Sequence, residues 1–290
     1  MTKRTRAVLS EQRDLPLLGF LWRWKMATTA GLARALYPQN SVNSVYMRLW
    51  KLEKAGFICT RNDIGNNAFV WTLDKKGYAA IRPHLPPLRE DGYMSENLRH
   101  DLIVSAIHFG ERIFGEINGL EFWTEQELRR IDPTYFPQWV TKSERHRPDG
   151  YWHTGTSPIP NTVALEVELS AKVDAEYDKC ARFYDDHSEI TAVLWIVQKP
   201  GLARKIHSKM ERSSRHSNKH SFVMLDPVSR DGWQSPIVLG HRCGSLITDL
   251  LLTQPKRDLN VSYGQFSLDI RKSPHKSKHS RFLSAPSFSY

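Results

Sequence analysis

The chain has 290 residues, of which 40% are hydrophobic and 25% charged, and these are ordinary values for a protein with a globular core. Its net charge of +10 is high and predicts a polyanionic partner. The three cysteines lie far apart without the Cys/His spacing of a zinc site, and no apolar run resembles a signal peptide or a membrane span. We therefore expect a cytoplasmic protein of two domains, without structural zinc and without a membrane span.

Residues 9–81 are predicted to form a DNA-binding domain of the winged helix-turn-helix class. Periodicity and capping residues indicate three helices, and two short strands then flank a turn at 63–67. The third helix has a polar face, and an arginine follows in the first strand. The residues that we expect to contact DNA are Asn43, Ser44, Tyr46, Met47, Arg48, Lys51 and Arg61. Because some winged helices bind proteins instead, a protein-binding role is the alternative.

Three further segments are set apart by composition. Residues 82–94 contain three prolines that oppose helix formation, so we expect a linker there. Residues 203–220 are rich in Lys, Arg, Ser and His, and they predict a loop or an exposed helix over backbone phosphate, with a solvated insertion as the alternative. Residues 254–290 are basic and poor in large apolar side chains, which predicts a disordered tail that adds DNA affinity.

Residues 95–253 show the order helix, strand, strand, strand, helix, strand, which predicts an α/β sandwich. The first of these helices is expected to begin near Ser95. Residues 190–197 are apolar without interruption, as is typical of a strand that is buried on both faces. Glu96 and His100 are polar residues at the start of the first helix and candidates for an accessory role. A structural histidine is the alternative for His100.

Acidic residues gather in a predicted hairpin. The strand at 162–169 alternates aliphatic residues with Glu166 and Glu168, so both carboxylates lie on one face. Asp149 leads into the preceding strand, and Glu125 ends a third strand that would join them if it is a neighbour. Such acids repel one another unless a cation lies between them, and Mg²⁺ or Mn²⁺ suits oxygen ligands. Two solvated acids on an exposed strand are the alternative.

The dipeptide Pro148-Asp149, a gap of sixteen residues, and the run 166–168 together resemble the PD-(D/E)XK nuclease superfamily. The resemblance implies that Asp149 and Glu166 hold the metal. Where the pattern has lysine, this chain has Glu168. Lys172 is then expected to supply the missing charge from a shifted position, or Glu168 is itself a third ligand.

The chain also resembles the replication-relaxation family, which includes relatives of MobC-type plasmid relaxases and joins a winged helix to a nuclease-like core. The likeness is carried by 98–102, 123–125 with Leu128 and Arg129, 147–150, and 165–168 with Lys172 and Tyr177. It implies a Mg²⁺- or Mn²⁺-dependent DNA endonuclease, a relaxase that nicks a plasmid transfer origin, with an accessory mobilisation protein as a further partner.

Two other functions stay open at this point. One is a DNA-binding regulator of plasmid replication or transfer with an inactive nuclease-like domain, and the other is a restriction or defence endonuclease. A relaxase that conserves bond energy attacks through a side chain, for which Tyr177 and Tyr184 are candidates. Their place on the apolar stripe of a predicted helix favours core packing instead.

Overall fold

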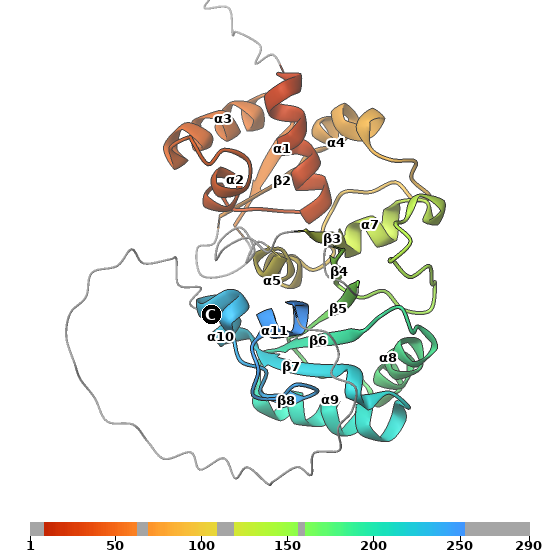
Figure 1. Cartoon of the computed structure of the whole chain (residues 1–290). Helices are drawn as coiled ribbons and strands as arrows, with labels where there is room; N and C mark the ends of the chain where they lie inside the picture. Colours follow the sequence, from red (N-terminus) through yellow and green to blue (C-terminus); the bar gives the residue numbers. More distant parts are fainter. Residues whose placement is uncertain (1–8, 63–68, 109–118, 156–159, 253–290) are drawn as a thin grey trace, which may run out of the picture.

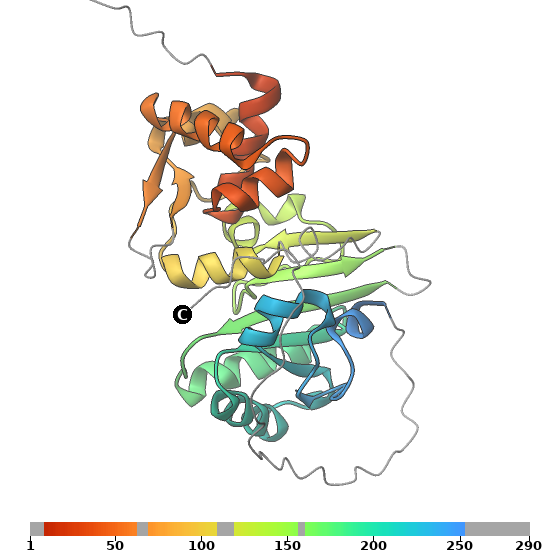
Figure 2. The same cartoon turned by 90° about the vertical axis from the view of Figure 1, so that its left-hand side faces the viewer.

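The computed structural model describes residues 9–62, 69–108, 119–155 and 160–252. An N-terminal unit of helices and a two-stranded sheet packs beside a six-stranded mixed sheet with helices on both faces (Figures 1 and 2). The mixed α/β architecture that the sequence predicts is therefore confirmed. Among the described helices, none combines the length and apolar composition that crossing a bilayer requires. The predicted turn at 63–67 and the predicted tail at 254–290 lie outside the described residues.

The N-terminal unit follows the element order that the sequence predicts. Strands β1 and β2 pair antiparallel, and the side chains of Thr28 and Ser41 cap the second and third helices by accepting hydrogen bonds from Gly31 and Ser44 amides. The elements are α1 (Glu11–Trp24), α2 (Thr29–Leu36), α3 (Val42–Lys54), β1 (Ile58–Arg61), β2 (Val70–Leu73) and α4 (Lys75–Ile81). One apolar core holds them together, with Leu17, Leu21 and Leu49 fully buried. The winged-helix assignment itself stays a prediction.

The larger sheet has the strand order β3-β4-β5-β6-β7-β8. Strands β5, β6 and β7 run parallel, while β3, β4 and β8 are antiparallel to their neighbours. The strands are β3 (Leu120–Thr124), β4 (Gly150–Thr154), β5 (Asn161–Glu168), β6 (Ala192–Val197), β7 (His220–Met224) and β8 (Leu239–Gly240). Strand β6 is buried on both faces, because Leu194 belongs to one core cluster and Trp195 to the other.

Helices cover both faces of this sheet. The helices α5 (Leu98–His108), α10 (Leu225–Asp231) and α11 (Ile247–Leu252) pack with the face of Leu165, and α8 (Asp174–Asp186) and α9 (Pro200–Ser213) with the face of Ala164. Helix α7 (Glu125–Arg130) follows β3 directly. Four short 3₁₀ turns complete the described elements: η1 (Arg82–His84), η2 (Pro133–Tyr135), η3 (Ser217–Lys219) and η4 (Gly232–Gln234).

Two predicted segments differ in detail from the structure. Helix α5 begins at Leu98 rather than near Ser95, because the Asn97 side chain accepts from the His100 amide at 3.2 Å while the Ser95 hydroxyl donates to Asp101. The basic segment 203–220 is mainly helix α9. The helix is therefore the predicted form that the structure has, but because α9 buries Ala203, Ile206 and Met210 against the sheet, the segment is neither a loop nor a solvated insertion.

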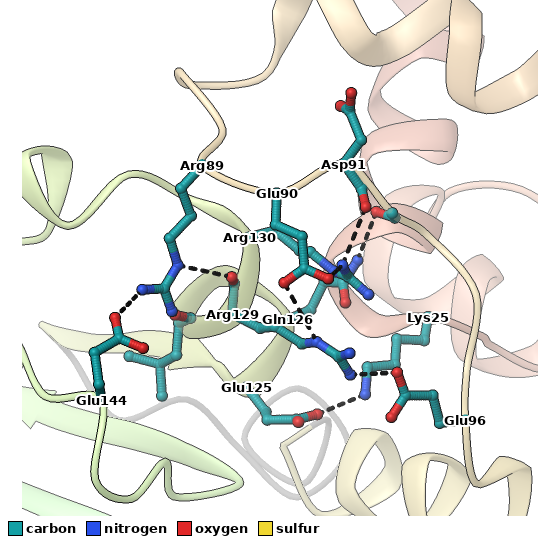
Figure 3. Close-up of polar contacts among 12 residues, drawn as sticks. Lys25, Arg89, Glu90, Asp91, Glu96, Glu125, Gln126, Arg129, Arg130 and Glu144 are labelled. Carbon is teal, nitrogen blue, oxygen red and sulfur yellow. Dashed lines mark hydrogen bonds and ion pairs between the residues drawn. The ribbon is translucent and has the colours of Figure 1, made fainter.

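The predicted linker 82–94 lies against α7 along much of its length. The Arg89 guanidinium donates to the carbonyls of Leu128 and Arg129, both at 3.0 Å, and the Trp22 indole of α1 and the Gln126 amide of α7 both donate to the Gly92 carbonyl. Figure 3 shows the surrounding ion pairs, Arg130 with Glu90 and Arg89 with Glu144 among them. The segment is therefore held between the N-terminal unit and the sheet domain.

Candidate functional site

Asp149 stands immediately before β4 and beside the acidic strand β5. Its backbone amide donates to the Leu165 carbonyl at 2.9 Å, and its Oδ2 accepts from the Val167 amide at 2.7 Å. Val167 lies between Glu166 and Glu168 in the chain, so this bond holds the Asp149 carboxylate beside the strand segment that carries both glutamates. Burial raises the pKa of Asp149, but His100 and the Val167 amide outweigh it and hold that pKa below its ordinary value.

Glu166 points toward α8 and is 2% exposed. Its Oε1 is 2.5 Å from His146 Nε2 and also accepts a short hydrogen bond from the Tyr184 hydroxyl. Burial lowers the pKa of His146, yet Glu166 outweighs it and raises the pKa to about 10. His146 is therefore an imidazolium when no metal is bound. In the described part of the chain, both of these bonds use Oε1 and none is formed by Oε2.

Glu168 forms an ion pair with Lys172, four residues further along the chain. Burial raises the pKa of Glu168 to about 7, against the opposing effect of Lys172. Burial lowers the pKa of Lys172, but Glu166 and Glu168 outweigh it, so the ammonium stays charged. The Lys172 side chain is 46% exposed, which leaves it accessible to a ligand from solvent.

His100 occupies the other side of Asp149. Its Nε2 lies 3.1 Å from the Val167 carbonyl and 3.5 Å from Asp149 Oδ2, while its Nδ1 lies 3.6 Å from Asp101 Oδ1. Burial lowers the pKa of His100, but Asp149 and Asp101 outweigh it and raise the pKa to about 11. Both ring nitrogens of His100 face partners within the protein, Asp101 on one side and Asp149 and the Val167 carbonyl on the other, so the structure favours a role in charge neutralisation over one as a ligand.

Lys25, at the end of α1, is a residue that the sequence analysis misses. Its Nζ lies 3.2 Å from Asp101 Oδ1 and 2.5 Å from Glu125 Oε2, and its side chain is only 10% exposed. A chain of charges therefore runs from the N-terminal unit through Asp101 and His100 to Asp149. Nothing in the sequence signals this contact, because Lys25 is 76 residues from Asp101 and 100 from Glu125.

Glu125 takes a place different from the predicted one. Strands β3 and β4 are neighbours, and the Glu125 amide donates to the Asp149 carbonyl at 3.3 Å. The Glu125 carboxylate, however, is bound to Lys25 (Figure 3). Its role in the structure is therefore to join α7 to α1, and it is not assembled with the three acids. Glu96 is likewise paired with Arg129, at 2.5 Å.

The two candidate tyrosine nucleophiles are both fully buried. The Tyr177 hydroxyl accepts from the Lys172 amide at 3.0 Å, and the Tyr184 hydroxyl donates to Glu166. Burial and the neighbouring Glu166 raise the pKa of Tyr184 well above its ordinary value, which opposes formation of a phenolate. Both side chains therefore pack in the core, which is the alternative that the sequence favours. From there Tyr177 contacts the Lys172 amide and Tyr184 contacts the Glu166 carboxylate.

The predicted DNA-contacting residues lie on α3 and β1. Five of them are exposed on α3: Asn43, Ser44, Tyr46, Met47 and Lys51. Arg48 differs, because its guanidinium turns back to α1 and binds both carboxylate oxygens of the fully buried Asp14. It joins two helices of the N-terminal unit rather than extending into solvent. Arg61 is half-buried at the end of β1.

The charged histidines predict that stability falls as the pH rises. The folded protein keeps protons on His100 and His146 up to pKa values of about 11 and about 10, whereas the unfolded chain releases them near 6.5. Their contribution is thus complete below pH 6.5 and is lost as the pH rises to about 10 for His146 and about 11 for His100. We expect the free energy of unfolding, measured by urea titration in EDTA, to decline across this window.

His100→Gln should flatten this decline, because it removes one of the two groups. His84→Gln is the matched control, since His84 is exposed and lies in the 3₁₀ turn η1, directly after α4. An unchanged pH dependence in His100→Gln would contradict the assignment of a charged His100.

Comparison with known proteins identifies no family. No family model matches the chain, and no curated protein matches it. The solved structure of the restriction endonuclease FokI matches with a TM-score of 0.30 and 10% identity, over 76% of this chain and 42% of FokI. FokI bound to DNA matches with a TM-score of 0.27 and 13% identity, over 77% and 45%. The chain thus spans less than half the length of these structures, and such likeness assigns no activity to it.

Proposed function

We propose that the protein is a metal-dependent DNA endonuclease that nicks a plasmid transfer origin as a mobilisation relaxase. The observation that carries the proposal is the hydrogen bond from the Val167 amide to Asp149, which holds this carboxylate beside the strand of Glu166 and Glu168. The motifs shared with the PD-(D/E)XK superfamily and the replication-relaxation family support the same chemistry. Residues 9–81 would act as the winged helix, 82–94 as linker, 95–253 as nuclease domain and 254–290 as basic tail.

The site offers a donor set that fits a hard divalent cation. Asp149, Glu166 and Glu168 contribute only carboxylate oxygens, which Mg²⁺ and Mn²⁺ prefer. Their mutual repulsion is visible in Glu168, whose pKa is raised by burial first and also by Glu166 and Asp149. A bound Mg²⁺ or Mn²⁺ would supply Lewis-acid activation of the scissile phosphate and of water.

The remaining charges of the site have separate tasks in this mechanism. Lys172 would neutralise negative charge that develops on the phosphate, because its ammonium is both charged and accessible. His100 would hold Asp149 ionised and oriented. Glu168, with a pKa of about 7, would serve as a third ligand or accept the proton of the attacking water near neutral pH.

A regulator without activity is the second candidate, and one observation favours it. Glu166 Oε1 is already engaged by His146 and Tyr184, and the lysine of the nuclease pattern is replaced by Glu168. In that case the winged helix would bind DNA and the inactive sheet domain would serve dimerisation.

The deciding experiment is nicking of supercoiled plasmid with Mg²⁺ or Mn²⁺ against EDTA. Plasmids with and without the cognate mobilisation region are compared. Metal-dependent nicking confined to the cognate plasmid is the expected result. Nicking of many unrelated plasmids would favour a restriction or defence enzyme and contradict the relaxase assignment. Salt-sensitive binding without any nicking would favour the regulator.

The exposed face of α3 predicts a specific loss of DNA affinity. Lys51→Ala should weaken binding to all sequences and reduce the slope of log K against log salt by about 1, because one phosphate contact is lost. Lys75→Ala is the matched control, since Lys75 is exposed on α4, beyond α1 from α3 (Figure 1). Fluorescence anisotropy at several salt concentrations measures both. Equal slopes for the two variants would exclude α3 as the DNA-binding face.

A further inference from the structure

Three side chains from distant parts of the chain meet at the α8 side of the acidic cluster. His146 precedes β4, Glu166 lies on β5 and Cys180 lies on α8. One ligand atom of each, a ring nitrogen, a carboxylate oxygen and the thiol sulfur, lies within 4.8 Å of the other two. The Cys180 sulfur is 3.7 Å from His146 Nδ1 and 3.8 Å from Nε2, and Nε2 is 2.5 Å from Glu166 Oε1.

The sulfur-to-nitrogen spacings are close to those of a tetrahedral transition-metal site. Zinc bonds of about 2.0–2.1 Å to nitrogen or oxygen and about 2.3 Å to sulfur place two ligand atoms about 3.3–3.6 Å apart. The sulfur-to-nitrogen distances of 3.7 and 3.8 Å already approach this range. The contact between His146 and Glu166 is shorter, so it would have to open by a small side-chain rotation, or Oε2 would bind in place of Oε1.

The donor set itself discriminates between metals. Mg²⁺ and Mn²⁺ favour oxygen, whereas a thiolate with an imidazole selects zinc and other softer ions. Glu166 and Cys180 are buried, while the His146 side chain is 15% exposed and forms the side from which solvent reaches the cluster. The rings of Phe183 and Tyr184 pack edge-on against the imidazole and restrict its position.

We propose that His146, Glu166 and Cys180 form a binding site for Zn²⁺ or a similar transition-metal ion. Binding would replace one proton on the histidine and one on the thiol, so two protons are released for each ion bound. The site shares Glu166 with the oxygen-only cluster of Asp149 and Glu168. A bound Zn²⁺ would therefore withdraw Glu166 from that cluster and inhibit Mg²⁺-dependent nicking. Only the inhibition of nicking rests on the proposed function.

The test is titration of the full-length protein with Co²⁺, which reports thiolate ligation through a sulfur-to-cobalt charge-transfer absorption. We expect one equivalent of Co²⁺ to produce this band, and Zn²⁺ but not Mg²⁺ to abolish it. Cys180→Ser should lose the band. Cys243→Ser, a control at an exposed cysteine, should retain it. A band that persists in Cys180→Ser, no band in the wild type, or displacement by Mg²⁺ would each overturn the proposal.

Two further variants separate this inference from the nuclease proposal. Asp149→Asn should keep the cobalt band, because Asp149 is not among the three ligands, and its folding can be checked by circular dichroism. His146→Gln should lose tight Co²⁺ binding while remaining folded. If the wild type nicks DNA, Zn²⁺ should inhibit nicking by the wild type but should not inhibit nicking by Cys180→Ser. If no nicking occurs at all, the cobalt titration still decides the site.

Discussion

Asp149→Asn is expected to reduce metal-dependent nicking by on the order of 10³-fold or more. Removing one preorganised electrostatic contact to a transition state costs roughly 10²–10³-fold, and a lost carboxylate ligand should reach at least the upper end. The substitution removes charge but preserves an oxygen that can accept from the Val167 amide at the same position. The fold should therefore persist, and DNA affinity should stay close to that of the wild type.

The matched control for this variant is Asp231→Asn. Asp231 is an exposed aspartate at the end of α10, in a segment that contributes nothing to the acidic cluster. Rates of supercoiled-plasmid nicking and anisotropy-based affinities are compared for both variants and for Glu166→Gln, which should show a comparable loss. Wild-type nicking by Asp149→Asn would remove Asp149 from the cleavage site and with it the proposed mechanism.

Lys25→Met is expected to destabilise the protein by about 3 kcal/mol, because it removes a buried cation from two carboxylates, Asp101 and Glu125. The Asp101 side chain is 8% exposed and the Lys25 side chain 10%, so water can replace little of the lost interaction. Methionine keeps the apolar length of the side chain, and it occupies a position whose φ of 63° is equally unfavourable for both residues. Urea unfolding measures the change.

Lys75→Met, on exposed α4, is the control and should change stability by less than about 0.5 kcal/mol. The double variant Lys25→Met with Asp101→Asn should lose less than the sum of the single losses, because the neutral amide side chain that replaces the Asp101 carboxylate no longer needs a cation. A Lys25→Met variant as stable as the control would show that this contact does not hold the two parts of the protein together.

Local patterns predicted much of the fold because they depend only on neighbours in the chain. The alternation along 162–169 places Val163, Leu165 and Val167 in one core cluster and Ala164 in the other, as the period of two requires. Strand β6 begins two residues later than expected. The first residue of α5 is harder to predict, because Ser95 and Asn97 are both good N-cap residues. In the structure the Ser95 hydroxyl binds Asp101, and Asn97 caps the helix instead.

Side-chain partners could not be predicted in the same way. Arg48 fits the exposed face of a recognition helix, yet Asp14 on α1 captures it, because a fully buried carboxylate without a cation would be costly. The sequence places Glu125 beside Asp149 if strands β3 and β4 are neighbours, and they are neighbours in the structure. The Glu125 carboxylate nevertheless binds Lys25, whose approach depends on how α1 docks against α7.

The sequence by itself determined the order of the elements and the face on which Glu166 and Glu168 lie, because these follow from the geometry of single strands and short spacings. Only the tertiary structure decided which charges meet. The three cysteines show no metal-ligand spacing in the chain, yet folding brings Cys180 to His146 and Glu166 from 34 and 14 residues away. Burial then makes the loss of either partner costly, because a charge removed from water must find a partner within the protein.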